Sequence, residues 1–152
     1  MTDNSFSTLA CSFDSANAYI YIWLSKKWKV IYVGQTNNCK GTIGRAIEHI
    51  GVDGTLRKRF KEKIGLNLEV SKDLYLLSFP LPQEKRYISL ESSYRLAVEY
   101  NVQIGLRECR SSLNPVYDVI SKVTYTDVAS KHNVKELAED IIQKFIKVYN
   151  NL

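Results

Sequence analysis

Two apolar runs near the start of the chain have the composition of paired strands. They cover residues 18–24 and 29–34, are rich in β-branched and aromatic residues, and are separated by a polar link short enough for a tight reversal. A third run, residues 73–81, ends at Pro80 and Pro82, which lack the N–H that a strand ladder needs. The pattern predicts a hairpin and a third strand.

Helical spacing of apolar residues follows these strands. Thr42, Thr55 and Ser89 are candidate residues for helix starts, and Gly51 and Gly65 are expected to end the first two helices. The last segment repeats apolar residues on one face, as an amphipathic helix does. The predicted helices cover residues 41–51, 54–65, 89–101 and 134–151.

The order of these elements predicts an α+β fold with a small antiparallel or mixed β-sheet flanked by helices and a C-terminal helical extension. A further strand is expected within residues 116–125. The length of 152 residues suits one domain with a sizeable core. We expect an irregular segment (1–17), a core (18–115), and a strand and amphipathic helix (116–152) packed on that core.

Composition indicates a cytoplasmic protein with no membrane partner. No apolar run has the length needed to span a bilayer, and the N-terminus does not resemble a secretion signal. Cys11, Cys39 and Cys109 are far apart and odd in number, so they are interpreted as reduced thiols and not as a disulfide framework or a zinc site.

Positive charge is concentrated in one segment of the chain. The net charge is +5, but residues 26–63 alone hold ten Lys or Arg residues against three acidic ones. Such a segment is typical of a polyanion-binding surface, although a solvated helix face has the same appearance. The residues expected to contact a DNA backbone are Lys40, Arg57, Lys58, Arg59 and Lys61.

Several polar residues occur in an order that carries a family resemblance. Tyr21 and Tyr32 lie on the two strands of the hairpin, and Tyr32 begins the sequence "YVG". Arg45 and His49 follow at a spacing of four, which places them on one helix face. With Gly34, a later Glu91 and Asn114 in "LNP", this pattern resembles the GIY-YIG nuclease superfamily over roughly residues 18–115.

The resemblance implies a catalytic site. Tyr21 would be the general base and Tyr32 the residue that positions the nucleophile, or the reverse. Arg45 would bind the scissile phosphate, and His49 would take a proton from Tyr21 or from the attacking water. Glu91 would hold one Mg²⁺ or Mn²⁺ ion, since such ions take one or two carboxylates and keep several waters. The supporting residues would be Gly34, Gln35 and Asn114.

Three positions depart from the family pattern or compete for a role in it. Tyr19 stands where the family has a glycine, so its side chain would have to point toward DNA or a second subunit. Gln35 stands where some members carry a lysine that assists the base. Asn101 is a rival to Asn114 for the late asparagine position.

These observations predict a divalent-metal-dependent DNA endonuclease of the restriction, mobile-element or repair kind. The alternative is a catalytically inactive nucleic-acid-binding module on the same fold, which Tyr19 and Gln35 would favour. A protein unrelated to nucleic acids is the third interpretation. The C-terminal helix is a candidate surface for a homodimer, or equally a face that packs on its own sheet, through Leu137, Ile141, Phe145 and Val148.

Overall fold

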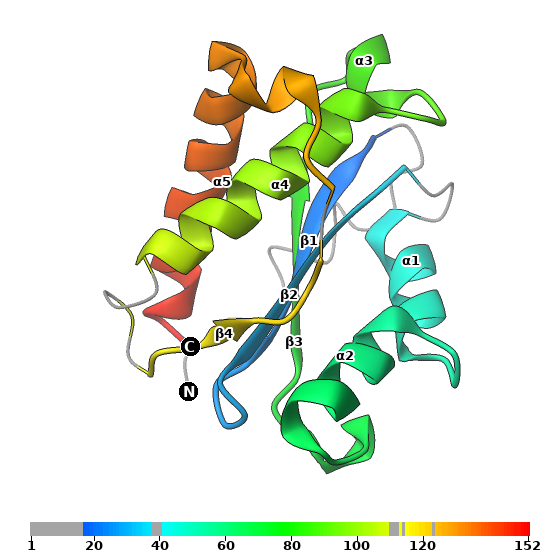
Figure 1. The fold of residues 1–152 in the computed structure, drawn as a ribbon, viewed down its shortest axis with the longest axis vertical. Coiled ribbons are helices and arrows are strands. Elements are labelled where there is room, and N and C mark those ends of the chain that lie inside the picture. Colours follow the sequence, from blue (N-terminus) through cyan, green and yellow to red (C-terminus); the bar gives the residue numbers. More distant parts are fainter. Residues whose placement is uncertain (1–16, 38–40, 110–112, 114, 123) are drawn as a thin grey trace.

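The sheet is the centre of the molecule, and β1 lies inside it between β3 and β2 in the order β3-β1-β2-β4 (Figure 1). The computed structural model describes residues 17–37, 41–109, 113, 115–122 and 124–152. The strands are β1 (Tyr19–Ser25), β2 (Val30–Thr36), β3 (Tyr75–Pro80) and β4 (Asp118–Val119). The predicted α+β fold with a mixed sheet is confirmed at this level.

The second strand is covered along only part of its outer edge. β1 pairs antiparallel with both β2 and β3, whereas β4 pairs parallel with β2 at Val30 and Ile31 alone. Beyond this short ladder, the N–H of Val33 donates to Ser121 Oγ at 3.0 Å. The rest of β2 is therefore not paired with a strand on that side among the described residues.

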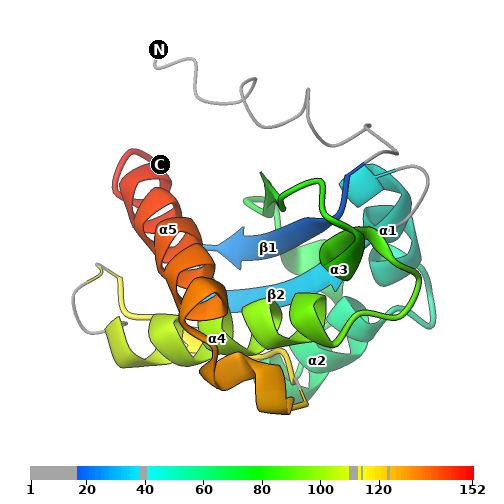
Figure 2. The same ribbon diagram turned by 90° about the horizontal axis from the view of Figure 1, so that it is seen from above.

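Helices cover both faces of the sheet. In Figure 1, α4 and α5 lie on one face, and α1 and α2 lie on the other. The view from above shows α4 running beside β2 (Figure 2), which is the strand that it contacts most, while α5 packs along α4. The α-helices are α1 (Gly41–Ile50), α2 (Thr55–Ile64), α3 (Lys85–Ile88), α4 (Ser93–Cys109) and α5 (His132–Tyr149), with short 3-10 turns η2 (Leu68–Val70) and η4 (Asp127–Ser130).

Alternation along the first two strands divides the core into two clusters. Side chains two residues apart on a strand point to the same face. Ile20, Ile22 and Leu24 consequently pack with α4 and α5 in the larger cluster. Tyr21 and Trp23 of the same strand join Tyr32, Leu56 and Phe60 in a smaller cluster on the side of α1 and α2. The tyrosines thus face the helix that carries Arg45 and His49.

The sequence prediction of helix ends is confirmed at some residues and wrong at others. Gly65 ends α2 in the left-handed conformation, with φ 79° and its N–H donating to Lys61 O at 2.8 Å. The residue before α2 is Gly54, with no side-chain cap, so the cap expected from Thr55 is wrong. Ser92, and not Ser89, caps α4, because its Oγ accepts the N–H of Arg95 at 2.9 Å.

The C-terminal helix belongs to the core of its own chain. Ile141 and Phe145 of α5 are buried, and Leu137 and Val148 are partly buried against the same cluster. The apolar stripe therefore packs within its own chain, which is the alternative to a dimer surface that the sequence left open. None of the helices in the described part of the chain has both the length and the apolar character needed to cross a bilayer.

Candidate active site

The phenol ring of Tyr21 lies across Gly34. The two residues are directly opposite each other in the β1–β2 ladder. A Cβ atom placed on Gly34 would lie 2.2 Å from Tyr21 Oη and 2.3 Å from Cζ, distances that no side chain can tolerate. The glycine of the "YVG" sequence therefore leaves room for the tyrosine of the neighbouring strand.

Helix α1 brings His49 to both tyrosines. The Nε2 atom of His49 forms a hydrogen bond with the Tyr21 hydroxyl. Its ring centroid lies 5.4 Å from that of Tyr21 and 5.2 Å from that of Tyr32. A hydrogen bond of 2.6 Å between Thr42 Oγ1 and Ser78 Oγ attaches the first turn of α1 to β3. The sequence prediction that the two tyrosines and His49 lie together agrees with this arrangement.

Burial keeps these three side chains uncharged at neutral pH. His49 is 3% exposed, and burial, followed by the positive charge of Arg45, lowers its pKa to about 4. Burial also raises the pKa of Tyr21 and of Tyr32 above the ordinary value of a phenol, while Arg45 beside them opposes the rise. A neutral His49 with its proton on Nδ1 can accept the hydrogen bond that the Tyr21 hydroxyl donates.

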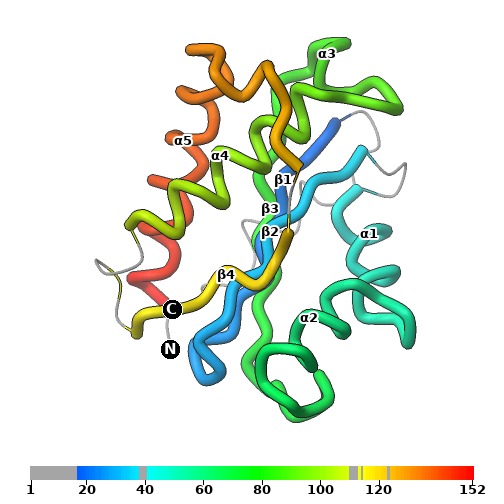
Figure 3. The backbone as a smooth tube through the Cα atoms, viewed as in Figure 1, coloured from blue at the N-terminus to red at the C-terminus, as the bar shows by residue number. Residues whose placement is uncertain are grey.

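Arg45 lies where this buried cluster meets solvent. Its side chain is 41% exposed and forms an ion pair with Glu48, three residues later on α1. Both side chains line a groove of about 540 Å³. The other residues that line it are Gln35, Thr36, Asn37, Leu90 and Arg95. The end of β2, α1 and the loop before α4 meet at this groove, whereas the β1–β2 turn lies at the opposite end of the sheet (Figure 3).

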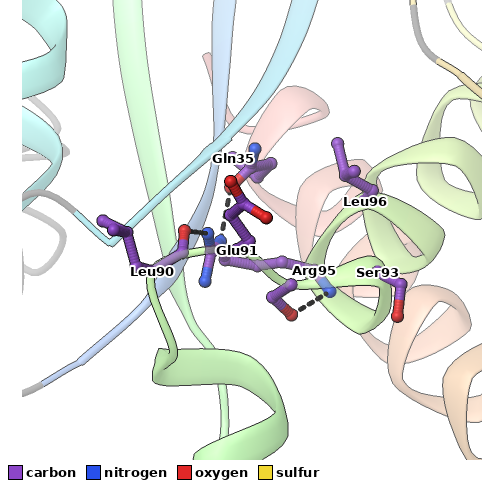
Figure 4. Close-up of a pocket in the computed structure, with 7 residues that line it drawn as sticks. Gln35, Leu90, Glu91, Ser93, Arg95 and Leu96 are labelled. Carbon is purple, nitrogen blue, oxygen red and sulfur yellow. Dashed lines mark hydrogen bonds between the residues drawn. The ribbon is translucent and has the colours of Figure 1, made fainter.

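Glu91, the residue expected to bind metal, lies outside this groove. It is exposed and precedes α4, so its expected place in the first turn of that helix is wrong. It lines an adjoining opening of about 430 Å³ together with Gln35, Leu90 and Arg95, as Figure 4 shows. The physical reason is that residues 85–88 form α3 and Ser92 caps α4, which leaves Glu91 in the connecting loop.

A different carboxylate, Glu99 on α4, influences the tyrosines electrostatically. Glu99 is 8% exposed, and burial raises its pKa to about 8, although the positive charges of Arg45 and Arg95 oppose the rise. Its negative charge in turn raises the pKa of both Tyr21 and Tyr32, which places it within electrostatic range of them. Sequence reasoning missed this residue. The available signal was a glutamate between Val98 and Val102, which are both fully buried.

Arg95 holds the loop between α3 and α4 in place. It is 4% exposed, and its Nε donates to Gln35 Oε1 at 2.5 Å. Its terminal nitrogens donate to the carbonyl oxygens of Tyr87 (2.5 Å), Ser89 (2.7 Å) and Leu90 (3.0 Å). Figure 4 shows Arg95 beside Gln35 and Leu90. Gln35, expected to support the site, is thus bound to the helix on the other face of the sheet.

Four further residues had a predicted place in the site or in the DNA-binding surface, and the structure describes two of them. Tyr19 is fully buried, so the expectation that it points toward DNA or a second subunit is wrong. Asn101 donates to the carbonyl oxygen of Ala129 at 2.9 Å and so attaches η4 to α4, away from the groove. Asn114 and Lys40 lie outside the described residues.

The basic side chains of α2 divide into paired and exposed groups. Arg57 forms an ion pair with Glu69 and donates to Ile50 O, and Arg59 pairs with Glu62 at 2.7 Å. Lys58 and Lys61 are exposed and line a shallow opening of about 460 Å³. These lysines are the predicted DNA contacts whose charge is most open to solvent.

Comparison with known proteins gives no relative from which a role could be transferred. No protein-family model, curated protein or solved structure matches this chain. Its function is therefore inferred from the residues of the site and their geometry.

We predict that Gly34→Ala displaces the Tyr21 ring from His49, because the new methyl group would occupy the position of the phenol. Overpacking of this kind costs about 1–3 kcal/mol. Urea unfolding measures the cost, and the nuclear Overhauser contact between the Tyr21 and His49 rings should weaken or vanish. Gly51→Ala is the matched control, since its methyl group would meet its nearest atom at 3.4 Å. An unchanged Tyr21–His49 contact in Gly34→Ala would contradict the close packing.

The buried carboxylate also predicts a pH dependence of stability. The pKa of Glu99 is about 8 in the folded protein against an ordinary 4.5, so the folded state binds this proton more tightly. The free energy of unfolding should therefore fall as the pH rises from about 4.5 to about 8. His49 acts in the opposite direction, but only between pH 6.5 and about 4.

A comparison between pH 6.5 and pH 8.5 isolates the contribution of Glu99. The parent protein and the exposed control Glu91→Gln should both lose stability between these two pH values. Glu99→Gln should lose less, because it has no carboxyl group at this position to ionise. Thermal unfolding at the two pH values measures the difference. If the parent and Glu99→Gln have parallel pH profiles, Glu99 is ionised in the folded protein at neutral pH.

Proposed function

We propose that this protein is a divalent-metal-dependent DNA endonuclease of the GIY-YIG type. The observation that supports this best is the hydrogen bond between Tyr21 and a neutral His49, next to the half-exposed guanidinium of Arg45. A buried hydrogen-bonded pair of proton carriers beside a cation in a groove suits the hydrolysis of a phosphodiester. The exposed lysines of α2 add a surface that suits the backbone of DNA.

The chemistry requires a base for the attacking water and a cation for the phosphate. In the proposed step, water attacks phosphorus and gives its proton to Tyr21 Oη, while the hydroxyl proton of Tyr21 moves to His49 Nε2. The phosphorus–oxygen bond to the leaving group breaks, the departing oxygen takes a proton from solvent, and the tyrosine ends the step neutral with the additional proton on His49, which then releases it to solvent. Arg45 would hold two phosphate oxygens through its planar fork and offset the charge that develops on them.

This proposal adds the buried Glu99 to the exposed Glu91 as a candidate for holding the metal ion. A carboxylate is the ligand type that Mg²⁺ prefers, and one or two of them are enough when waters complete the shell. The carboxylate of Glu99 is buried with a raised pKa, so a cation that takes the place of its proton would relieve the cost of ionising it. When bound, the ion would supply positive charge to the phosphate and its attacking water. The described residues form no cluster of three or more His, Cys, Asp or Glu side chains.

A plasmid-nicking assay with and without Mg²⁺ or Mn²⁺ tests the proposal. Tyr21→Phe removes one hydroxyl and should leave the fold intact, but the rate of cleavage should fall about a hundredfold or more. Arg45→Ala should lose at least as much. The double variant should lose far less than the product of the two losses, because groups that act together are not additive. Thermal unfolding of each variant is the control for folding.

The assay also separates the alternatives. Salt-dependent DNA binding without metal-dependent cleavage would identify a catalytically inactive binding module. Neither binding nor cleavage would mean that the protein does not act on DNA. Cleavage by Tyr21→Phe and by Tyr32→Phe at the parent rate, with unchanged melting temperature, would make the tyrosines packing residues and overturn the nuclease proposal.

The metal ligand has its own prediction. If Glu99 binds the ion, Mn²⁺ should raise the melting temperature of the parent protein and of Glu91→Gln, but not that of Glu99→Gln. Metal-dependent cleavage should be lost in Glu99→Gln, while DNA binding should remain close to the parent value. The opposite pattern, with Glu91→Gln losing both the thermal shift and cleavage, would assign the metal role to Glu91.

A further inference from the structure

We propose that Glu48 competes with the substrate phosphate for Arg45 and so sets the affinity of the site for DNA. This inference rests on the proposed function, because it assigns a regulator to the residue that would bind the phosphate. It concerns a residue that has no part in the proposed chemistry. Glu48 acts on the substrate only through Arg45.

The ion pair lies inside the groove that a phosphate would enter. Arg45 and Glu48 project from successive turns of α1, form an ion pair and line the same opening as Gln35, Thr36 and Asn37. Glu48 accepts from Nη1 of the Arg45 guanidinium, so a phosphate that binds the planar fork through Nη1 has to displace the carboxylate.

The other guanidinium of the groove is not available for this exchange. Arg95 also lines the opening, but it is 4% exposed and its three nitrogens donate to Gln35 and to the carbonyl oxygens of the loop before α4. Arg45 is 41% exposed and its partner Glu48 is 52% exposed. Of these two arginines, Arg45 is therefore the one whose partner is exposed enough for an incoming phosphate to displace.

The exchange has a defined electrostatic effect. An exposed pair of this kind is weak, so a phosphodiester can displace the carboxylate. The displaced carboxylate stays on the same helix turn and repels the phosphate that replaced it. Glu48 thus weakens the binding of DNA without taking part in bond cleavage, and its removal should lower KM and leave kcat nearly unchanged.

The neighbouring helix supplies a matched control. Arg59 and Glu62 on α2 form an ion pair of the same spacing, with side chains 25% and 62% exposed. Glu62→Gln removes the same charge from the same kind of pair as Glu48→Gln. The two variants have equal net charge, so a difference between them reports the position of the carboxylate and not the overall charge of the protein.

The experiment measures binding of a fluorescein-labelled 20-base-pair duplex by anisotropy in EDTA, and steady-state cleavage in Mg²⁺. Glu48→Gln should tighten binding about threefold to tenfold and lower KM by a similar factor. This gain should disappear when Arg45→Gln is added. Any smaller gain from Glu62→Gln should persist in the Arg45→Gln background, since it does not depend on Arg45. Circular dichroism and thermal unfolding check the fold of each variant.

Two results would overturn the inference while the proposed function stands. The first is a gain from Glu48→Gln that persists without Arg45, and the second is a large loss of kcat in Glu48→Gln, which would make Glu48 part of the catalytic machinery. A parent protein that neither binds nor cuts the duplex would overturn the proposed function and this inference together.

Discussion

The packing of Tyr21 across Gly34 is the contact on which the arrangement of the site depends. Because the residue opposite Tyr21 has no side chain, the phenol crosses β2 and its hydroxyl reaches His49 on α1. The glycine has a steric role here and not a conformational one, since its φ is not positive, unlike those of Gly41 and Gly65. The absence of a Cβ atom at Gly34 thus allows β1 to form a side-chain hydrogen bond with α1, the helix that carries Arg45 and His49.

Burial then decides which of these side chains carry charge. Desolvation raises the pKa of Tyr21 and of Glu99 and lowers that of His49, so each is driven toward its neutral form. Arg45 is charged at neutral pH, as guanidinium groups are, and the hydrogen bond with Glu48 raises its pKa further against the opposing effect of burial. The groups that could exchange protons thus lie in the interior, and the guanidinium that could bind an anion, that of Arg45, lies at the surface. Such a division favours proton transfer within the cluster and ligand exchange at the groove.

The elements that local rules specify could be predicted from the sequence, and those that tertiary contacts specify could not. The hairpin, α1, α2 and the Gly65 helix end follow from alternation, helical spacing and a left-handed glycine. The start of α4 does not. Ser89, Ser92 and Ser93 are all suitable caps, and the choice is tied to the bonds of Arg95 to the loop carbonyls. A helix that began at Ser89 would carry Glu91 in its first turn, whereas the observed helix begins at Ser93 and leaves Glu91 in the preceding loop.

The short ladder between β4 and β2 leaves part of the β2 edge without a partner strand in the described part of the chain. The tyrosines belong to the α1 side, whereas Glu99 belongs to α4 on the other face. Side chains on opposite faces of a sheet are separated by its backbone, so they can approach each other only around an edge. β4 pairs with β2 at two residues, and the strand beyond Val33 has no further strand beside it in the described part of the chain. Among the strands, α4 contacts β2 most, and the charge of Glu99 acts on the pKa of Tyr21 and of Tyr32 from that side of the sheet. Coulombic interactions act over longer distances than packing contacts do, so a carboxylate on one face of the sheet can influence phenols on the other face.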